Sequence, residues 1–188
     1  FRQQMLNLMT ENDKLKSGKF AMSTDQPADH TPGEGVQLKD IQGFWKGQDV
    51  FLGPDGSISV HLDNGLSVKI DQVTHFDEDT IGVAMNAGRM NEDGTILGVT
   101  EGNLITFNKD YADTFTNSHE PYHFFVNAGM LTEADRQKIQ AKAQEFHQNG
   151  NFMFNWQDNM EENEANAFAQ LIAERDQYRG TELGRIIQ

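Results

Sequence analysis

The stretch "SISVHLDNGLSVKI", Ser57 to Ile70, gives the clearest indication of local structure in the sequence. Apolar and polar residues alternate on both sides of Asp63-Asn64-Gly65, so each half presents one apolar face, as a β-strand does. An Asn-Gly pair between two alternating runs is typical of a tight hairpin turn. We therefore expect two antiparallel strands joined at this pair.

The surrounding region, residues 40–127, has the same texture. Short runs of β-forming residues alternate with turn signals such as Gly-Pro-Asp-Gly at 53–56 and Asn-Glu-Asp-Gly at 91–94. A series of short strands joined by tight turns predicts an antiparallel meander, and closure would leave few exposed strand edges. The predicted fold class is α+β and β-rich: an antiparallel meander that closes into a six- to eight-stranded barrel or curled sheet, with an N-terminal helix and two C-terminal helices.

A barrel of this kind would enclose a small apolar cavity, which predicts where a small apolar ligand would bind. The residues expected to line it lie at alternating positions of the central strands. The predicted ligand-binding residues are Val60, Val68, Ile70, Val83 and Met85.

The expected first strand opens with Gly43-Phe44-Trp45, and a turn follows at Asp55-Gly56. A Gly-x-Trp sequence at the first strand, followed by a meander of short strands, resembles the lipocalin or calycin superfamily, especially its small bacterial members. The resemblance covers roughly residues 38–127 and implies a barrel in which Trp45 closes one end by packing. The extra helices depart from that family, so the resemblance implies the fold more than a ligand pocket.

The N-terminal region is predicted to contain a helix at residues 1–20 and a linker at 21–39, where proline and glycine are frequent. Apolar residues in the helix follow the a/d spacing of a coiled coil, with an asparagine at one a position. We expect self-association or a protein partner there; the alternative is a helix packed on its own domain. The predicted partner-binding residues are Met5, Leu8, Asn12 and Leu15.

The C-terminal extension, residues 128–188, is predicted to be helical. One helix begins after Thr132 and continues to about Gln148, and a second extends from about Asp158 to Arg179. Three acids stand in the first turns of the second helix, where the helix dipole favours negative charge. This explains them without a metal. They are Glu161, Glu162 and Glu164, and the aromatic residues before them, expected to pack on the barrel, are Phe152, Phe154 and Trp156.

Charge and composition exclude several classes of function. The formal net charge is −14 with no cluster of Lys and Arg, which disfavours binding to nucleic acids and to anionic membrane surfaces. Without cysteine the chain has neither disulfides nor a catalytic thiolate. No apolar run is long enough to cross a membrane, and we expect no direct membrane insertion. Because the sequence starts at Phe1, we expect a processed chain or a fragment, with a periplasmic or extracellular location.

The stretch "SHEPYHFF", Ser118 to Phe125, contains the His-Glu-x-x-His spacing of zinc-dependent hydrolases. That chemistry needs both histidines on one face of a helix, with the glutamate beside them. The aromatic residues around the second histidine favour a strand instead, in which His119 and His123 would lie ~13 Å apart. No third ligand stands at a familiar spacing, and Glu145 is the nearest helical acid. We therefore predict no metal ligand and no catalytic residue.

Together these observations favour a non-enzymatic binding or assembly module of the cell envelope that uses no cofactor. One alternative is a carrier of a small apolar ligand. The other is a zinc-dependent hydrolase that uses the motif at residues 119–123.

Overall fold

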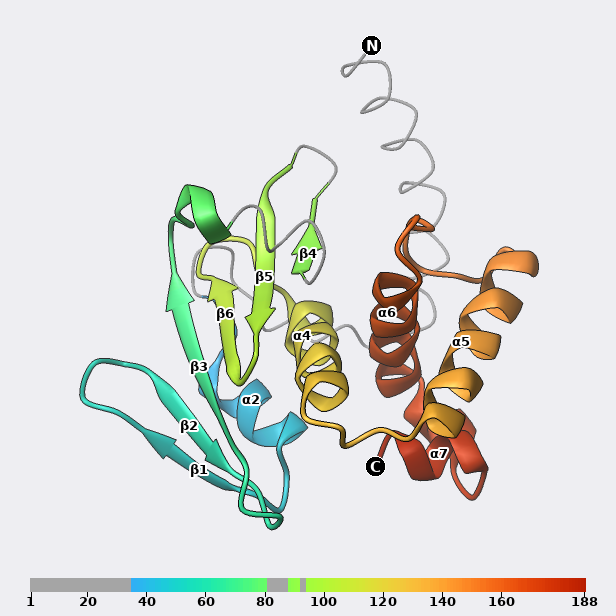
Figure 1. The fold of residues 1–188 in the computed structure, drawn as a ribbon, viewed down its shortest axis with the longest axis horizontal. Coiled ribbons are helices and arrows are strands. Elements are labelled where there is room, and N and C mark those ends of the chain that lie inside the picture. Colours follow the sequence, from blue (N-terminus) through green and yellow to red (C-terminus); the bar gives the residue numbers. More distant parts are fainter. Residues whose placement is uncertain (1–34, 81–87, 92–93) are drawn as a thin grey trace.

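The structure is a computed structural model that describes residues 35–80, 88–91 and 94–188. The sheet and the helix at residues 38–44 form one half of the described structure, and the helices after residue 113 form the other (Figure 1). The strands are β1 (Asp49–Leu52), β2 (Ile58–His61), β3 (Ser67–Val73), β4 (Gly88–Met90), β5 (Ile96–Glu101) and β6 (Leu104–Asn108). The helices are α2 (Leu38–Phe44), α4 (Thr114–Asn127), α5 (Glu133–Gln148), α6 (Met160–Ala173), the 3-10 helix η1 (Arg175–Tyr178) and α7 (Glu182–Ile186).

The six strands form one open, mixed sheet in the order β1-β2-β3-β6-β5-β4. β3 and β6 are parallel, whereas the other neighbours are antiparallel. The prediction of an antiparallel meander closed into a barrel is therefore wrong. β6 returns to pair with β3, and β4 and β1 are the two edge strands. The turn residues mark where each strand ends, but they do not determine which distant strands pair, so the sequence pattern did not predict this order.

The hairpin around Asn64-Gly65 is confirmed. β2 and β3 are antiparallel, with Ile58 opposite Ile70 and Val60 opposite Val68. Gly65 has a φ of 84°, a left-handed conformation that glycine adopts without steric cost. The register places the apolar side chains of both strands on the same face of the sheet, as their alternation predicts.

The Gly43-Phe44-Trp45 segment lies in and just after helix α2, so the prediction that it opens the first strand is wrong. β1 begins later, at Asp49. Trp45 is 4% exposed and packs edge-on against the rings of Phe124 and Phe125 in α4. Its role is structural packing, but against a helix and not at the end of a barrel.

Helix α4 lies between two apolar cores, with the sheet on one side and α6 on the other (Figure 1). The first core lies between the sheet, α2 and α4, and it contains Val60, Val68 and Ile70, three of the predicted ligand-binding residues. The second joins α4 to α5 and α6. The other predicted ligand-binding residues, Val83 and Met85, and the predicted partner-binding residues Met5, Leu8, Asn12 and Leu15 lie outside the described residues.

The C-terminal region is helical, but the prediction of two helices there is wrong, because the second ends at Ala173 and η1 and α7 follow it. α5 follows Thr132, whose hydroxyl accepts a hydrogen bond from the backbone N–H of Asp135. Phe152 is buried in the second core, and Phe154 and Trp156 are partly buried against it, so these aromatic residues pack internally. In the part of the chain that the structure describes, no helix is both long enough and apolar enough to cross a membrane.

Candidate metal centre

The segment expected to be a strand around residues 118–128 is instead the body of helix α4. The helix starts with a capping box in which Asp113 accepts from the backbone N–H of Thr116 and the Thr116 hydroxyl accepts from the N–H of Asp113. Arg89 of β4 pairs with Asp113 and donates to the Thr116 hydroxyl. Burial of residues 116–124 on both sides of the helix outweighs the strand preference of its aromatic residues and the cost of Pro121.

Gly98 in β5 allows α4 to approach the sheet closely. A Cβ atom at this position would lie 2.7 Å from Cγ2 of Thr116 and 2.9 Å from Cγ of Glu120. Such contacts are too short for carbon atoms, so any larger residue would push the helix outwards. The glycine therefore sets the distance between the sheet and the helix that carries the histidines.

His119 and His123 lie one helical turn apart on the side of α4 that faces α6, and both are almost completely buried. Their Nε2 atoms are 3.2 Å apart. Glu162, in the first turn of α6, places Oε2 at 3.2 Å from Nε2 of His119 and Oε1 at 3.2 Å from Nε2 of His123. The three side chains thus offer donor atoms that lie within 4.8 Å of one another.

These separations match the distances between the three ligand atoms on one face of a tetrahedral zinc site. With Zn–N and Zn–O bonds of about 2.0–2.2 Å, two ligand atoms of a tetrahedral ion lie about 3.3 Å apart. A set of two histidines and one glutamate is typical of catalytic zinc, which keeps its fourth position for water or substrate. The donor set and its spacing therefore fit zinc.

Two outer contacts orient the imidazole rings. Nδ1 of His119 lies 2.9 Å from Oδ1 of Asn166, and Nδ1 of His123 lies 3.0 Å from Oε1 of Glu161. Because both partners are acceptors, each Nδ1 carries a proton, which leaves Nε2 to face the cluster. This arrangement is typical of metal-bound histidines, whose second nitrogen donates to a carboxylate or carbonyl.

Without a cation, a proton compensates the charge of the cluster. Burial lowers the pKa of His123, but the hydrogen bonds and charges of Glu161 and Glu162 have a larger combined effect and raise this pKa to about 10. Burial likewise opposes ionisation of Glu162, but His119 and His123 lower its pKa to about 2. Oε1 of Glu162 is buried, and its contact with Nε2 of His123 at 3.2 Å is an ion pair and not a well-aligned hydrogen bond. An acceptor in this position suits a metal ion.

Glu120 lies between α4 and the sheet and is 0% exposed. Its Oε2 accepts from the hydroxyl of Thr100 at 2.7 Å, and its Oε1 accepts from the backbone N–H of Arg89 at 3.0 Å. Burial raises the pKa of Glu120, while the neighbouring histidines partly offset this effect. The two histidines act on this carboxylate electrostatically, and a fixed carboxylate with a raised pKa is suited to accept and return a proton.

A second polar network holds α4, α5 and α6 together behind the cluster. The hydroxyl of Tyr122 donates to Oε2 of Glu164 at 2.7 Å, and Arg136 of α5 reaches the same oxygen at 2.9 Å. Burial and then Glu164 raise the pKa of Tyr122, so its hydroxyl remains a donor. This network fixes the position of α6 and hence of Glu162.

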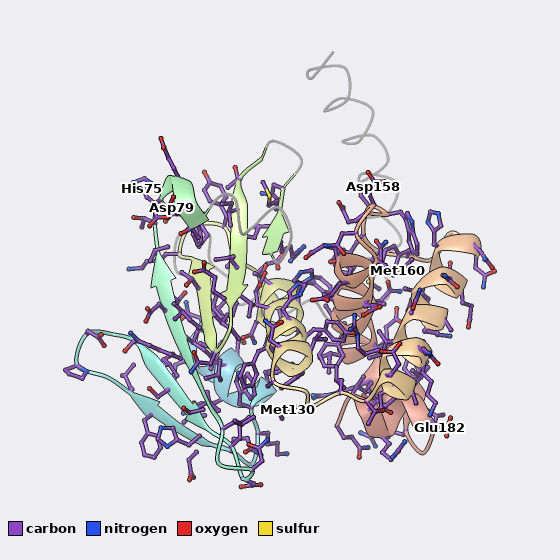
Figure 2. All side chains as sticks on the ribbon, in the orientation of Figure 1. His75, Asp79, Met130, Asp158, Met160 and Glu182 are labelled. Atoms are coloured by element: carbon purple, nitrogen blue, oxygen red, sulfur yellow. The ribbon has the colours of Figure 1, made fainter. Side chains whose placement is uncertain are left out.

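The spacing of His119 and His123 is visible in the sequence, but the predicted strand gave no metal ligand there, and the helix dipole alone explained Glu162. The structure brings these three residues together. Glu145, considered as a third ligand, instead pairs with Lys142 at 2.7 Å. Of the other described histidines, His61 and His75 are exposed, and His75 lies just after β3, away from α4 (Figure 2). The ring of His147 stacks on that of Trp156.

Comparisons with protein-family models, with curated proteins and with solved structures found no match for this chain. The resemblance to lipocalins thus stays a prediction, although the sheet is not the closed barrel that it implies.

Proposed function

We propose that this protein is a zinc-dependent hydrolase of the metallopeptidase type. One observation carries the proposal: the Nε2 atoms of His119 and His123 and the carboxylate of Glu162 converge at 3.2 Å from one another. Two histidines in a His-Glu-x-x-His helix, completed by a distant acid, are the ligand chemistry of zinc peptidases.

Each residue of the site has a separate role in this proposal. His119, His123 and Glu162 would hold the ion, and zinc bound there would acidify a water ligand and polarise the carbonyl group of a substrate. Glu120 would accept the proton of the attacking water and return it to the leaving amine. Thr100 and the backbone N–H of Arg89 hold the Glu120 carboxylate in place, so its position does not depend on substrate.

The test begins with metal content. We expect protein purified without a histidine tag and loaded with zinc to retain one equivalent after dialysis, as measured by mass spectrometry of the metal. His123→Ala should lose it, whereas His75→Ala, which changes an exposed histidine at the end of β3, should not. Equal zinc retention by the wild-type protein and His123→Ala would remove the basis of the proposal.

The second part separates zinc binding from catalysis. Glu120→Gln should keep zinc, because Glu120 is not among the three ligands, yet slow the cleavage of a quenched fluorescent casein by about 10²- to 10⁴-fold. Full activity in Glu120→Gln would assign the proton transfer to another group. A zinc-loaded protein without hydrolytic activity on peptides, esters or amides would limit the site to a structural role.

A further inference from the structure

A cleft of about 1220 Å³ lies along the side of α4 opposite the histidines. Thr114, Asn117, Ser118 and Phe125 line it at the three-, four- and seven-residue steps that share one helix face. Helix α2 and the β2–β3 turn form one part of the remaining wall. The loop after α4, where Met130 lies (Figure 2), and the segment from the end of α6 to the last residue form the other part. One helix thus carries the candidate metal ligands on one face and part of the cleft on the other.

Two side chains that line the cleft carry buried polar atoms without a partner. Trp45 is 4% exposed and Asn117 is 3% exposed. Neither Nε1 of Trp45 nor Oδ1 of Asn117 has a hydrogen-bond partner among the described residues, although the Asn117 amide group donates to the carbonyl of Asp40. Buried polar groups are normally paired, so an unpaired donor and an unpaired acceptor beside one cleft require an explanation.

The cleft also has an apolar floor. Phe44, Phe125 and Phe168 all line it, and their rings lie 6.1–6.5 Å from one another, centre to centre. Phe44 and Phe125 are only partly buried, so they can accept a further apolar side chain. Aromatic surfaces of this kind are typical of binding sites, where they contribute most of the contact area.

The charge at the cleft is opposite in sign to that of the chain. Four basic residues line it against three acidic ones, in a protein with a formal net charge of −14. All four basic residues are exposed, and one of them, Arg179, pairs with Asp176 at 2.8 Å. A locally positive surface on an acidic protein attracts an anionic group. The basic residues are Lys39, Lys46, Arg175 and Arg179, and the acidic ones are Asp40, Asp63 and Asp176.

We propose that this cleft binds an extended peptide segment in which an aromatic or aliphatic side chain stands next to an acidic one. Both unpaired atoms are buried, so the side chains of Trp45 and Asn117 must turn toward the cleft when the peptide binds. A peptide group then offers one acceptor for the Trp45 indole N–H and one donor for Oδ1 of Asn117. The apolar side chain lies on the phenylalanine floor, and the acidic one faces Lys46 and Arg175. The volume exceeds the roughly 300–1,000 Å³ of small-molecule sites, which favours a peptide. This inference does not depend on the proposed hydrolase activity.

The test follows the indole N–H signals of ¹⁵N-labelled protein by NMR, with Trp156→Phe to assign the signal of Trp45. The probe is a pool of acetylated, amidated hexapeptides made of Phe, Leu, Asp, Glu and Gly. The matched pool carries Lys and Arg in place of the acids. We expect the acidic pool, and not the basic one, to move the Trp45 signal downfield, because the N–H gains an acceptor.

Charge reversal then tests the orientation of the peptide. Lys46→Glu and Arg175→Glu change exposed residues, and each should weaken binding by about tenfold or more. Lys109→Glu, an exposed residue outside the cleft, should leave it unchanged. The proposal fails if the acidic pool moves no signal, if both pools act alike, or if charge reversal has no effect.

Two other occupants have distinct signatures. An equal shift with N-acetylphenylalanine alone would assign the cleft to small aromatic acids and overturn the peptide proposal. A dimer, seen by sedimentation and lost in Arg175→Glu, would assign the cleft to a second copy of the chain and overturn it as well. Zinc content and hydrolytic activity are measured in the same samples, so failure of this proposal and failure of the proposed function are distinguished.

Discussion

Nδ1 of His119 in α4 lies 2.9 Å from Oδ1 of Asn166 in α6. Asn166 stands one helical turn after Glu162, so α6 supplies one donor of the candidate metal centre and, on the same face, the group that orients another donor. The two helices therefore build the centre jointly, and a shift of either one would disturb all three donor atoms.

The contact between His119 and Asn166 predicts a positioning role for the asparagine. Asn166→Ala should lower zinc affinity by about 10- to 100-fold, because the His119 ring loses the partner that fixes its orientation. Asn166→Asp keeps an acceptor and should restore most of the affinity. Competition with a fluorescent zinc chelator measures the constants.

Asn163 provides a matched control in the same helix. It is 0% exposed and exchanges hydrogen bonds with the backbone of Gln157, not with a histidine. Asn163→Ala should therefore lower the free energy of unfolding without changing zinc affinity. Equal losses of zinc affinity in Asn163→Ala and Asn166→Ala would assign only a structural role to Asn166.

The ion pairs of His123 and Glu162 predict how pH affects stabilisation by zinc. The raised pKa of His123, about 10 against an ordinary 6.5, stabilises the metal-free protein fully below pH 6.5, and this contribution is lost as the pH rises through 10. The lowered pKa of Glu162, about 2 against 4.5, contributes fully above pH 4.5 and is lost as the pH falls through 2.

Zinc bound as proposed would displace the proton of His123, so it would compete best at the pH where that proton is easiest to remove. The difference in melting temperature between zinc-loaded and chelator-treated protein should therefore increase from about pH 5.5 to about 8.5. Differential scanning calorimetry across this range measures it. A difference that stays constant or falls with rising pH would contradict direct coordination by His123.

The close approach at Gly98 predicts that the sheet tolerates no side chain there. Gly98→Ala should cost about 1–3 kcal/mol of unfolding free energy, because its methyl group would collide with Thr116 and Glu120. It should also lower hydrolytic activity, since Glu120 is displaced. Gly43→Ala in α2, where a Cβ meets nothing within 4 Å, should stabilise by up to about 1 kcal/mol. Urea unfolding distinguishes the two outcomes.

We expect the hydrogen bond from the Tyr122 hydroxyl to Glu164 to stabilise the fold independently of any bound metal. Tyr122→Phe should lower the free energy of unfolding by about 1.5–3 kcal/mol, because Glu164 is 4% exposed and loses a donor. Tyr111→Phe, at a residue that is 55% exposed, should have almost no effect. If the two substitutions prove equivalent in denaturant titrations, the Tyr122–Glu164 bond contributes nothing to stability.

Short-range features are predictable from the sequence because neighbouring residues determine them. The β2–β3 hairpin depends on an Asn-Gly pair between two alternating runs, and the start of α5 depends on the side chain of Thr132. The parallel pairing of β3 with β6 has no such local signal, since the register Ile70 to Ile105 joins distant segments. Self-association through residues 1–20 and an envelope location stay predictions.

The sequence by itself determined the spacing of His119, Glu120 and His123, the β2–β3 hairpin and the capped start of α5. The tertiary structure alone decided that residues 114–127 are helical and that Glu162 faces the histidines. The reason is physical: strand propensity and a helix dipole are local free energies of about 1 kcal/mol or less per residue. Burial of α4 between two apolar cores involves many side chains and outweighs them.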